Sequence, residues 1–267
     1  MRMPSAAFAD TGDWIAVLPV AAVEQHGPHL PVGVDTMIAE AMVARCVAAL
    51  AAVGDGASPA TFLPVVAVAK SDEHIAFRGT LTLSGDTCVR AFAEIGASVA
   101  RAGVRKLVIV TAHGGNVAPM GMVVRQLRLD HGLMAVSTAW GTGVALADLL
   151  PQGEGAYGIH AGAAETAMML AIAPGLVDMT AAADFRTVEL DNAARFRRLR
   201  AHGAVATGWA AQDLHPSGAA GDARAATAEM GEAILARQTA AFVELLGEIA
   251  DVDPATRVAP AAPGSLP

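Results

Sequence analysis

RKLVIVTA, residues 105–112, is a continuous apolar run rich in β-branched side chains, and sequence with helical spacing flanks it on both sides. Such a run is typical of a central strand in a parallel sheet, which is buried on both faces. A second run, WIAVLPV at 14–20, leads through a loop to helical spacing at 36–53. Because strand, loop and helix alternate, the sequence predicts an α/β fold with a mainly parallel sheet covered by helices on both faces.

The remaining elements follow the same alternation. We expect strands at 61–69 and 133–139, and helices at 86–102, after Asn116, and at 161–173, 191–201 and 223–250. With 267 residues and 54% apolar residues, the chain can bury one large core. We therefore expect a single domain over residues 1–252, followed by a disordered Pro- and Ala-rich tail at 253–267.

Composition narrows the class of partner. The formal net charge is −8 and no basic stripe is interleaved with aromatics, which argues against nucleic-acid binding. The longest apolar stretches fall short of the roughly 20 residues that span a bilayer, so we expect no membrane association. We expect a cytoplasmic protein with a small-molecule partner, in which Cys46 and Cys88 are buried thiols.

Acidic and histidine side chains gather in the loops that follow the predicted strands. They are Glu24, His26, Asp35, His113, His160 and Glu165. Ligands bind at the carboxyl ends of the strands in such sheets, and nitrogen and oxygen ligands without thiolates suit zinc, manganese or iron. Six ligands exceed the needs of one tetrahedral ion, so the sequence predicts two divalent metal ions. A pair of ions roughly 3.5–4 Å apart that shares a carboxylate supports hydrolysis.

Other interpretations of these residues remain open at this point. An E-x-H pair such as Glu24 and His26 is common by chance, although chance does not explain six such side chains at one edge. The segment HGGN at 113–116 could instead hold a phosphate on backbone amides at a helix start. Glu73 and His74 could either contact substrate or stabilise a surface loop.

Several motifs together resemble the creatininase (creatinine amidohydrolase) family over roughly residues 14–245. They are EQHGPHLP at 24–31 with Asp35-Thr36, Arg78-Gly79-Thr80, HGGN at 113–116, His160-Ala161-Gly162 with Glu165-Thr166, and Gly221-Asp222 with ATAE at 226–229. The resemblance implies a three-layer α/β/α sandwich, a two-metal active site, and a homo-oligomer that is often a hexamer. It also implies hydrolysis of cyclic or linear amides.

The resemblance also implies individual roles. Glu24, His26, Asp35 and His113 match metal ligands, with Asp35 bridging, and His160 matches a catalytic histidine. Creatininases carry a further metal-binding Glu two residues after the histidine that corresponds to His113, whereas this chain has Gly115 there. We expect Glu165 to supply that carboxylate and to share the catalytic site with His160.

The expected reaction is hydrolysis of a C–N amide bond in a cyclic amide, a formamide or a small peptide-like substrate. A metal-bridging hydroxide would attack the carbonyl, and His160 would pass a proton to the leaving nitrogen. We expect His74, Glu73, Asn116 and Tyr157 to contact the substrate. The alternatives are a catalytically silent binding or regulatory homologue that lacks the second ion, and a peptidase of the mycofactocin-precursor type.

Overall fold

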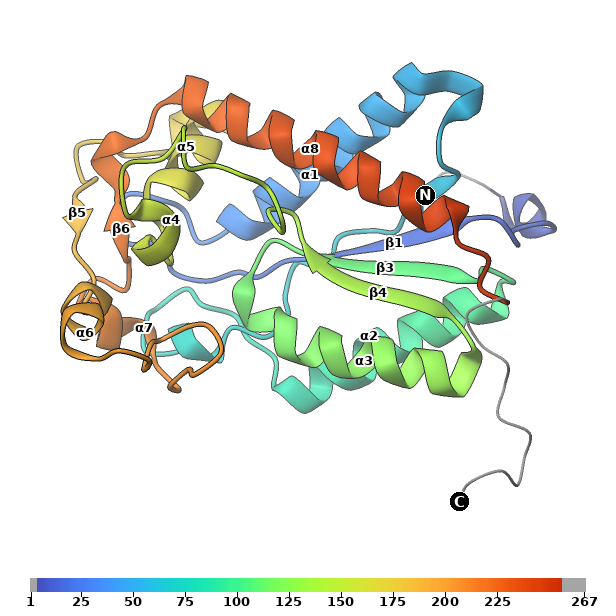
Figure 1. The fold of residues 1–267 in the computed structure, drawn as a ribbon, viewed down its shortest axis with the longest axis horizontal. Helices are drawn as coiled ribbons and strands as arrows, with labels where there is room; N and C mark the ends of the chain where they lie inside the picture. Colours follow the sequence, from blue (N-terminus) through green and yellow to red (C-terminus); the bar gives the residue numbers. More distant parts are fainter. Residues whose placement is uncertain (1–3, 256–267) are drawn as a thin grey trace.

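Four parallel strands form the central sheet of the computed structural model, which describes residues 4–255 (Figure 1). The strands are β1 (Ile15–Val20), β2 (Ala60–Phe62), β3 (Lys106–Thr111) and β4 (Met134–Ala139), in the spatial order β2-β1-β3-β4. In register, Ile15 of β1 lies opposite Lys106 of β3, and Lys106 lies opposite Met134 of β4. The parallel sheet predicted from the two apolar runs is therefore confirmed.

Helices cover both faces of this sheet. Helices α1 (Val34–Val53), α5 (Ala163–Ile172) and α8 (Ala228–Asp251) lie on one face, and α2 (Gly85–Arg101) and α3 (Val117–His131) lie on the other (Figure 1). The short elements are α4 (Glu154–Tyr157), α6 (Glu189–Arg195), α7 (Ala211–Leu214) and the antiparallel pair β5 (Asp184–Phe185) and β6 (Gly221–Asp222). The three-layer α/β/α arrangement is thus also confirmed.

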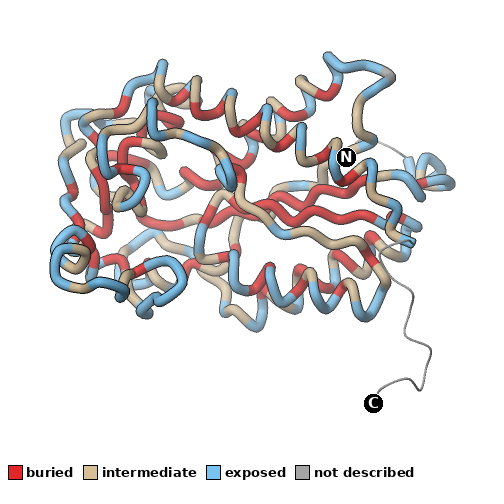
Figure 2. The backbone as a smooth tube through the Cα atoms, in the orientation of Figure 1, coloured by how far each residue is buried: buried red, intermediate tan, exposed pale blue. Residues whose placement is uncertain are grey.

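Alternation along the strands produces two separate cores. In β1, Ile15 and Val17 pack with α1, α5 and α8, whereas Ala16 and Leu18 pack with α2 and α3. Every residue of β1 and β3 is buried, as the red centre of Figure 2 shows. The close approach of α5 and α8 requires Gly231, because a Cβ there would lie 1.9 Å from the Ala167 carbonyl oxygen.

Two expected elements differ from the structure. The strand expected at 61–69 is regular only over Ala60–Phe62, because Pro64 has no N–H for the ladder. The basic helix expected at 191–201 is instead the short α6, which ends where Phe196 becomes extended (φ −115°, ψ 134°). Beyond that point the chain turns back, and the Ala201 N–H donates to Glu189 Oε2 at 2.7 Å.

The C-terminal part agrees with the predicted long helix, since α8 begins at Ala228 after a 3₁₀ turn at Ala223–Ala225. The predicted disordered tail at 253–267 lies, from residue 256 onward, outside the described residues.

Helix α1 contradicts the expectation that every apolar stretch of the chain is too short to span a bilayer. Its 20 residues have a mean hydropathy of 1.7 in the most apolar window, which is long and apolar enough to cross a membrane by length and composition. The same composition is found in core helices, and here α1 packs on α8 and α5. Its first turn carries Asp35, which is buried beneath the carboxyl edge of the sheet.

Candidate functional site

The six candidate metal ligands lie together at the carboxyl edge of the sheet. Glu24 and His26 lie in the loop after β1, Asp35 in the first turn of α1, His113 just after β3, His160 just before α5, and Glu165 in the first turn of α5. All are buried except Glu165, whose side chain is 24% exposed. The fold therefore brings together residues that are as far as 141 positions apart in the sequence.

Three groups of these side chains could each hold a metal ion. They are Glu24, His26 and His160; Glu24, Asp35 and His113; and His26, Asp35 and Glu165. Within each group, the ligand atoms lie within 4.8 Å of one another. Asp35 belongs to the second and third groups, so its carboxylate can serve two adjacent ions.

Several buried atoms of the cluster make no hydrogen bond within the described part of the chain. They include Glu24 Oε1, His26 Nε2 and Asp35 Oδ2. Buried polar groups without partners are costly, and an ion at the site is one established explanation for them. The donor set fits a divalent cation, because carboxylate oxygens and imidazole nitrogens without thiolates suit zinc, manganese or iron.

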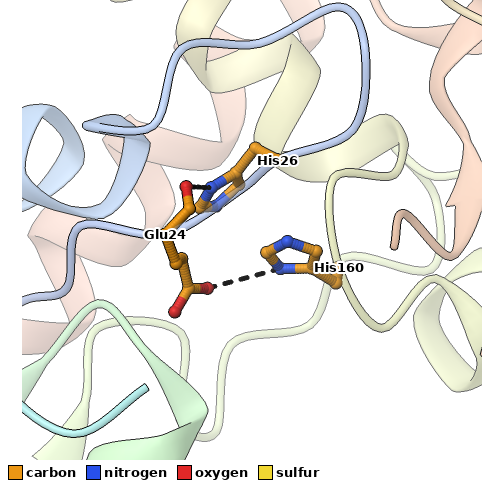
Figure 3. A group of neighbouring side chains, drawn as sticks. All are labelled: Glu24, His26 and His160. Carbon is orange, nitrogen blue, oxygen red and sulfur yellow. Dashed lines mark hydrogen bonds and ion pairs between the residues drawn. The ribbon is translucent and has the colours of Figure 1, made fainter. Parts of the chain in front are cut away.

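Backbone carbonyls fix the orientation of two histidines, and Figure 3 shows the carbonyl of Glu24 that holds His26. The Nδ1–H of His26 donates to the Glu24 carbonyl oxygen at 3.0 Å, which leaves Nε2 facing Asp35 Oδ1 at 3.7 Å. The Nε2–H of His160 donates to the Gln25 carbonyl oxygen at 2.6 Å, which leaves Nδ1 facing Glu24 Oε1 at 3.5 Å. In both rings, therefore, the nitrogen that can bind a cation or accept a proton points into the cluster.

The surroundings of the cluster raise the pKa values of His26, Asp35 and His113. Burial lowers the pKa of His26, but Asp35 and Glu165 outweigh it and raise that pKa to about 9. Burial and Glu24 raise the pKa of Asp35 to about 6. Burial also opposes charge on His113, yet Glu24 raises its pKa well above the usual range. These carboxylates thus stabilise positive charge at the positions that face them.

Glu165 links the cluster to the chain around His160. Its Oε2 accepts the Ala161 N–H at 2.6 Å and lies 3.9 Å from His26 Nε2. Ala161 has φ +54°, a left-handed conformation that is unfavourable for a residue with a side chain. Glu165 therefore stabilises the strained turn that directs His160 into the site.

Gln25 and His74 form a second layer around Glu24. The Gln25 amide donates to the Gly218 carbonyl oxygen at 2.9 Å and to His74 Nδ1 at 2.8 Å, so the His74 proton lies on Nε2. That Nε2 faces Glu24 Oε1 at 3.5 Å. Burial and His160 lower the pKa of His74 to about 3, so this ring is neutral near pH 7.

A cavity of about 80 Å³ opens onto the cluster. Its lining includes Glu73, His74, His113, His160 and Glu165, together with Ile159, His202 and Trp209. The sequence alone does not predict these last three as site residues. The Trp209 Nε1–H donates to the Ala201 carbonyl oxygen at 3.2 Å, which fixes the loop after α6 over the cavity. The only sequence signal was that Trp209 is one of three tryptophans.

Two predicted substrate contacts lie elsewhere. The Asn116 side chain is fully buried and donates to the Ala21 carbonyl oxygen and to Thr111 Oγ1, while its Oδ1 accepts the Lys70 N–H. These bonds give Asn116 a structural function in joining three segments. Tyr157 is half-buried on α4, and the described residues that line the cavity do not include it.

The phosphate alternative for residues 113–116 does not suit the site. The His113 ring lies 3.1 Å from Glu24 Oε1 and 3.1 Å from Glu73 Oε1. Carboxylates on both sides of this ring would repel an anion.

Comparisons with known proteins identify the family of this chain. The family model for creatininase, described as creatinine amidohydrolase, matches residues 1–246. A mycofactocin precursor peptide peptidase of Mycolicibacterium smegmatis is 32% identical over 225 residues, which cover 83% of this chain and 80% of that protein. The corresponding protein of Mycobacterium ulcerans is 34% identical, and the match spans 61% of each chain. A creatinine amidohydrolase of Pseudomonas putida is 30% identical over 65% of this chain and 70% of that protein.

Solved structures give the same result for the fold. A crystal structure of creatinine amidohydrolase (creatininase) aligns with a TM-score of 0.73 and 26% identity, covering 93% of each chain. A structure described as a manganese creatininase aligns with a TM-score of 0.71 and 25% identity, covering 93% of this chain and 94% of that chain. The family model matches nearly the whole chain, and the parallel sheet and the clustered candidate ligands are consistent with that match. The chain therefore belongs to the creatininase family of hydrolases.

Proposed function

We propose that this protein is a metal-dependent amidohydrolase that cleaves a C–N amide bond at a site for two divalent ions. The observation that carries the proposal is the position of Asp35, which belongs both to the group with Glu24 and His113 and to the group with His26 and Glu165. Zinc, manganese or iron suits these ligands. Divalent ions bound there would polarise a substrate carbonyl and lower the pKa of a water molecule.

The protein itself supplies proton transfer and a partly enclosed site. Because its Nε2–H is engaged with the Gln25 carbonyl, His160 can accept or release a proton only at Nδ1. Burial and His26 lower the pKa of His160, so the ring is neutral near pH 7 and can take up a proton. A proton taken up at Nδ1 could then pass to a leaving nitrogen in the adjoining cavity.

One observation favours a peptide-like substrate within this reaction class. A second cavity of about 210 Å³ shares Ala112 and Glu165 with the cavity at the cluster, and Trp140 and Gln238 also line it. Because both cavities adjoin Glu165, a substrate longer than a single small ring could contact both of them. The relatives named as mycofactocin precursor peptide peptidases point in the same direction.

Metal analysis tests the proposal. We expect close to two divalent ions per chain, and we expect Asp35→Ala to lose both because the two groups share this carboxylate. Asp86→Ala is the matched control. Both aspartates lie in the first turn of a helix, but Asp86 of α2 is exposed whereas Asp35 of α1 is buried. At most one ion, retained by Asp35→Ala, would contradict the two-ion site and support the silent homologue.

Activity is tested on three substrate classes with the metal-loaded protein. Creatinine, formamides and short peptides are compared, with Asp35→Ala as the inactive control. Hydrolysis of at least one class is the expected outcome, measured as the ring-opened product from creatinine and as a released amine or amino acid from the formamides and peptides. A protein that holds two ions and hydrolyses none of them would argue against the amidohydrolase assignment. The cytoplasmic location and the homo-oligomer expected from the sequence stay predictions.

A further inference from the structure

The two nitrogens of His113 face different carboxylates. Nδ1 lies 3.1 Å from Glu24 Oε1 and 3.9 Å from Asp35 Oδ2, within the proposed metal-ligand group. Nε2 lies 3.1 Å from Oε1 of Glu73, which belongs to none of the ligand groups among the described residues. This second contact is an ion pair rather than a well-aligned hydrogen bond.

Glu73 is itself held in place from the opposite side. Its Oε2 accepts from Lys70 Nζ at 3.3 Å, and its side chain is only 12% exposed. Glu73 lies in the 3₁₀ turn Asp72–His74, whose last residue, His74, lies beside Glu24. One turn therefore provides two side chains to the surroundings of the cluster.

Gly115 provides the space that this arrangement needs. A Cβ at position 115 would lie 2.3 Å from Glu73 Oε1 and 2.4 Å from His113 Nε2. Neither partner can move freely, because Lys70 holds Glu73 and Glu24 faces the far side of the His113 ring. By contrast, a Cβ at Gly114 would meet no atom within 4 Å. The requirement for glycine is thus specific to position 115.

We propose that Glu73 is a positioning residue that orients His113 for metal binding through Nδ1, and that Gly115 is required to admit its carboxylate. This inference rests on the proposed function, since it assumes that His113 is a metal ligand. A carboxylate on the second nitrogen of a ligating histidine fixes the ring orientation and increases its basicity. Loss of such a partner typically lowers metal affinity about 10- to 100-fold.

The first test measures zinc and manganese affinity by competition with a chromophoric chelator. We expect Glu73→Ala to weaken one ion about 10- to 100-fold and Glu73→Gln, which keeps the side-chain volume, to weaken it less. Asp72→Asn is the control, because Asp72 is an exposed neighbour that also pairs with Lys70, and it should bind as the wild type does. The melting temperature of the metal-free protein should stay within a few degrees in all three variants.

The second test exchanges the glycines. Gly115→Ala should weaken the same ion as Glu73→Ala does, whereas Gly114→Ala should leave both affinities unchanged. Equal affinities in Gly115→Ala and Gly114→Ala would overturn the role of Gly115.

The outcomes separate this inference from the function on which it rests. Wild-type protein that binds no zinc or manganese refutes both. If the wild-type protein binds two ions, and both Glu73→Gln and Glu73→Ala bind them with wild-type affinity, only the role of Glu73 is refuted. If Glu73→Ala fails to fold, the Gln variant alone decides, because it preserves the packing while removing the charge.

Discussion

Replacing Glu165 by Gln and by Ala separates the two contacts of this side chain. Its Oε2 accepts the Ala161 N–H at 2.6 Å and also lies 3.9 Å from His26 Nε2, within a proposed metal-ligand group. A glutamine keeps an oxygen that can accept the hydrogen bond but removes the negative charge. An alanine removes both.

The contacts that each substitution removes determine how far it should lower the free energy of unfolding. A hydrogen bond to a charged group contributes about 1.5–3 kcal/mol, and a neutral one contributes about 0.5–1.5 kcal/mol. Glu165→Gln should therefore lower the free energy of unfolding of the metal-free protein by about 1 kcal/mol, and Glu165→Ala by about 2–3 kcal/mol. The larger loss in Glu165→Ala arises because Ala161, at φ +54°, then loses the contact that stabilises its conformation.

The metal effect should be similar in both variants, because each lacks the anionic ligand. We expect the number of bound ions to fall from about two toward one, measured by elemental analysis after removal of excess metal, while unfolding is followed in urea. Glu229→Gln is the matched control, since Glu229 is an exposed glutamate in the first turn of α8. If Glu165→Gln retained both ions at wild-type affinity, Glu165 would not be a ligand.

Three further predictions concern pH, packing and the cavity. Metal affinity should increase as pH rises toward about 9, because raised pKa values keep protons on His26 and His113 that the metal must displace. The increase should reach up to about tenfold per pH unit for each proton released. Isothermal titration at several pH values measures this affinity, and a flat profile would contradict the prediction. Gly231→Ala should destabilise the protein by at least about 3 kcal/mol, because the new side chain would collide with the backbone of α5. Gly247→Ala lies in open space on the same helix, so it should be neutral or stabilising by up to about 1 kcal/mol. Equal stabilities of the two variants in urea would refute this packing argument. Trp209→Leu should raise KM with little change in kcat or metal content, and an unchanged KM would remove Trp209 from the substrate site.

The strands and the ligand cluster were predictable because local patterns determine them. The apolar runs at 14–20 and 105–112 became β1 and β3, and in a parallel sheet both lead into loops at the same edge. Glu24, His26 and His113 therefore had to lie near one another once the sheet was assumed. His160 and Glu165 followed from the predicted start of a helix beside that edge.

The loop that covers the cavity could not be predicted in the same way. Its path depends on the contact between the Ala201 N–H and Glu189, and on the contact between Trp209 and the Ala201 carbonyl. Both are tertiary contacts without a periodic pattern in the sequence. The basic composition around Arg197 instead favours a continuing helix, and it carries no sign that His202 lines the cavity.

The wide separation of the candidate ligands along the chain would link metal occupancy to the integrity of the whole fold. Glu24 follows β1 and Glu165 lies on α5, so the two carboxylates lie close together only when the sheet has formed and α5 packs on it. A partly synthesised or partly unfolded chain would lack the complete ligand set, so the ions should enter late in folding. Free metal at about a hundred times its Kd would add about 2.7 kcal/mol per site to the free energy of unfolding. Metal supply would then set part of the free energy of unfolding, and a distant packing defect such as Gly231→Ala would weaken metal binding without touching a ligand.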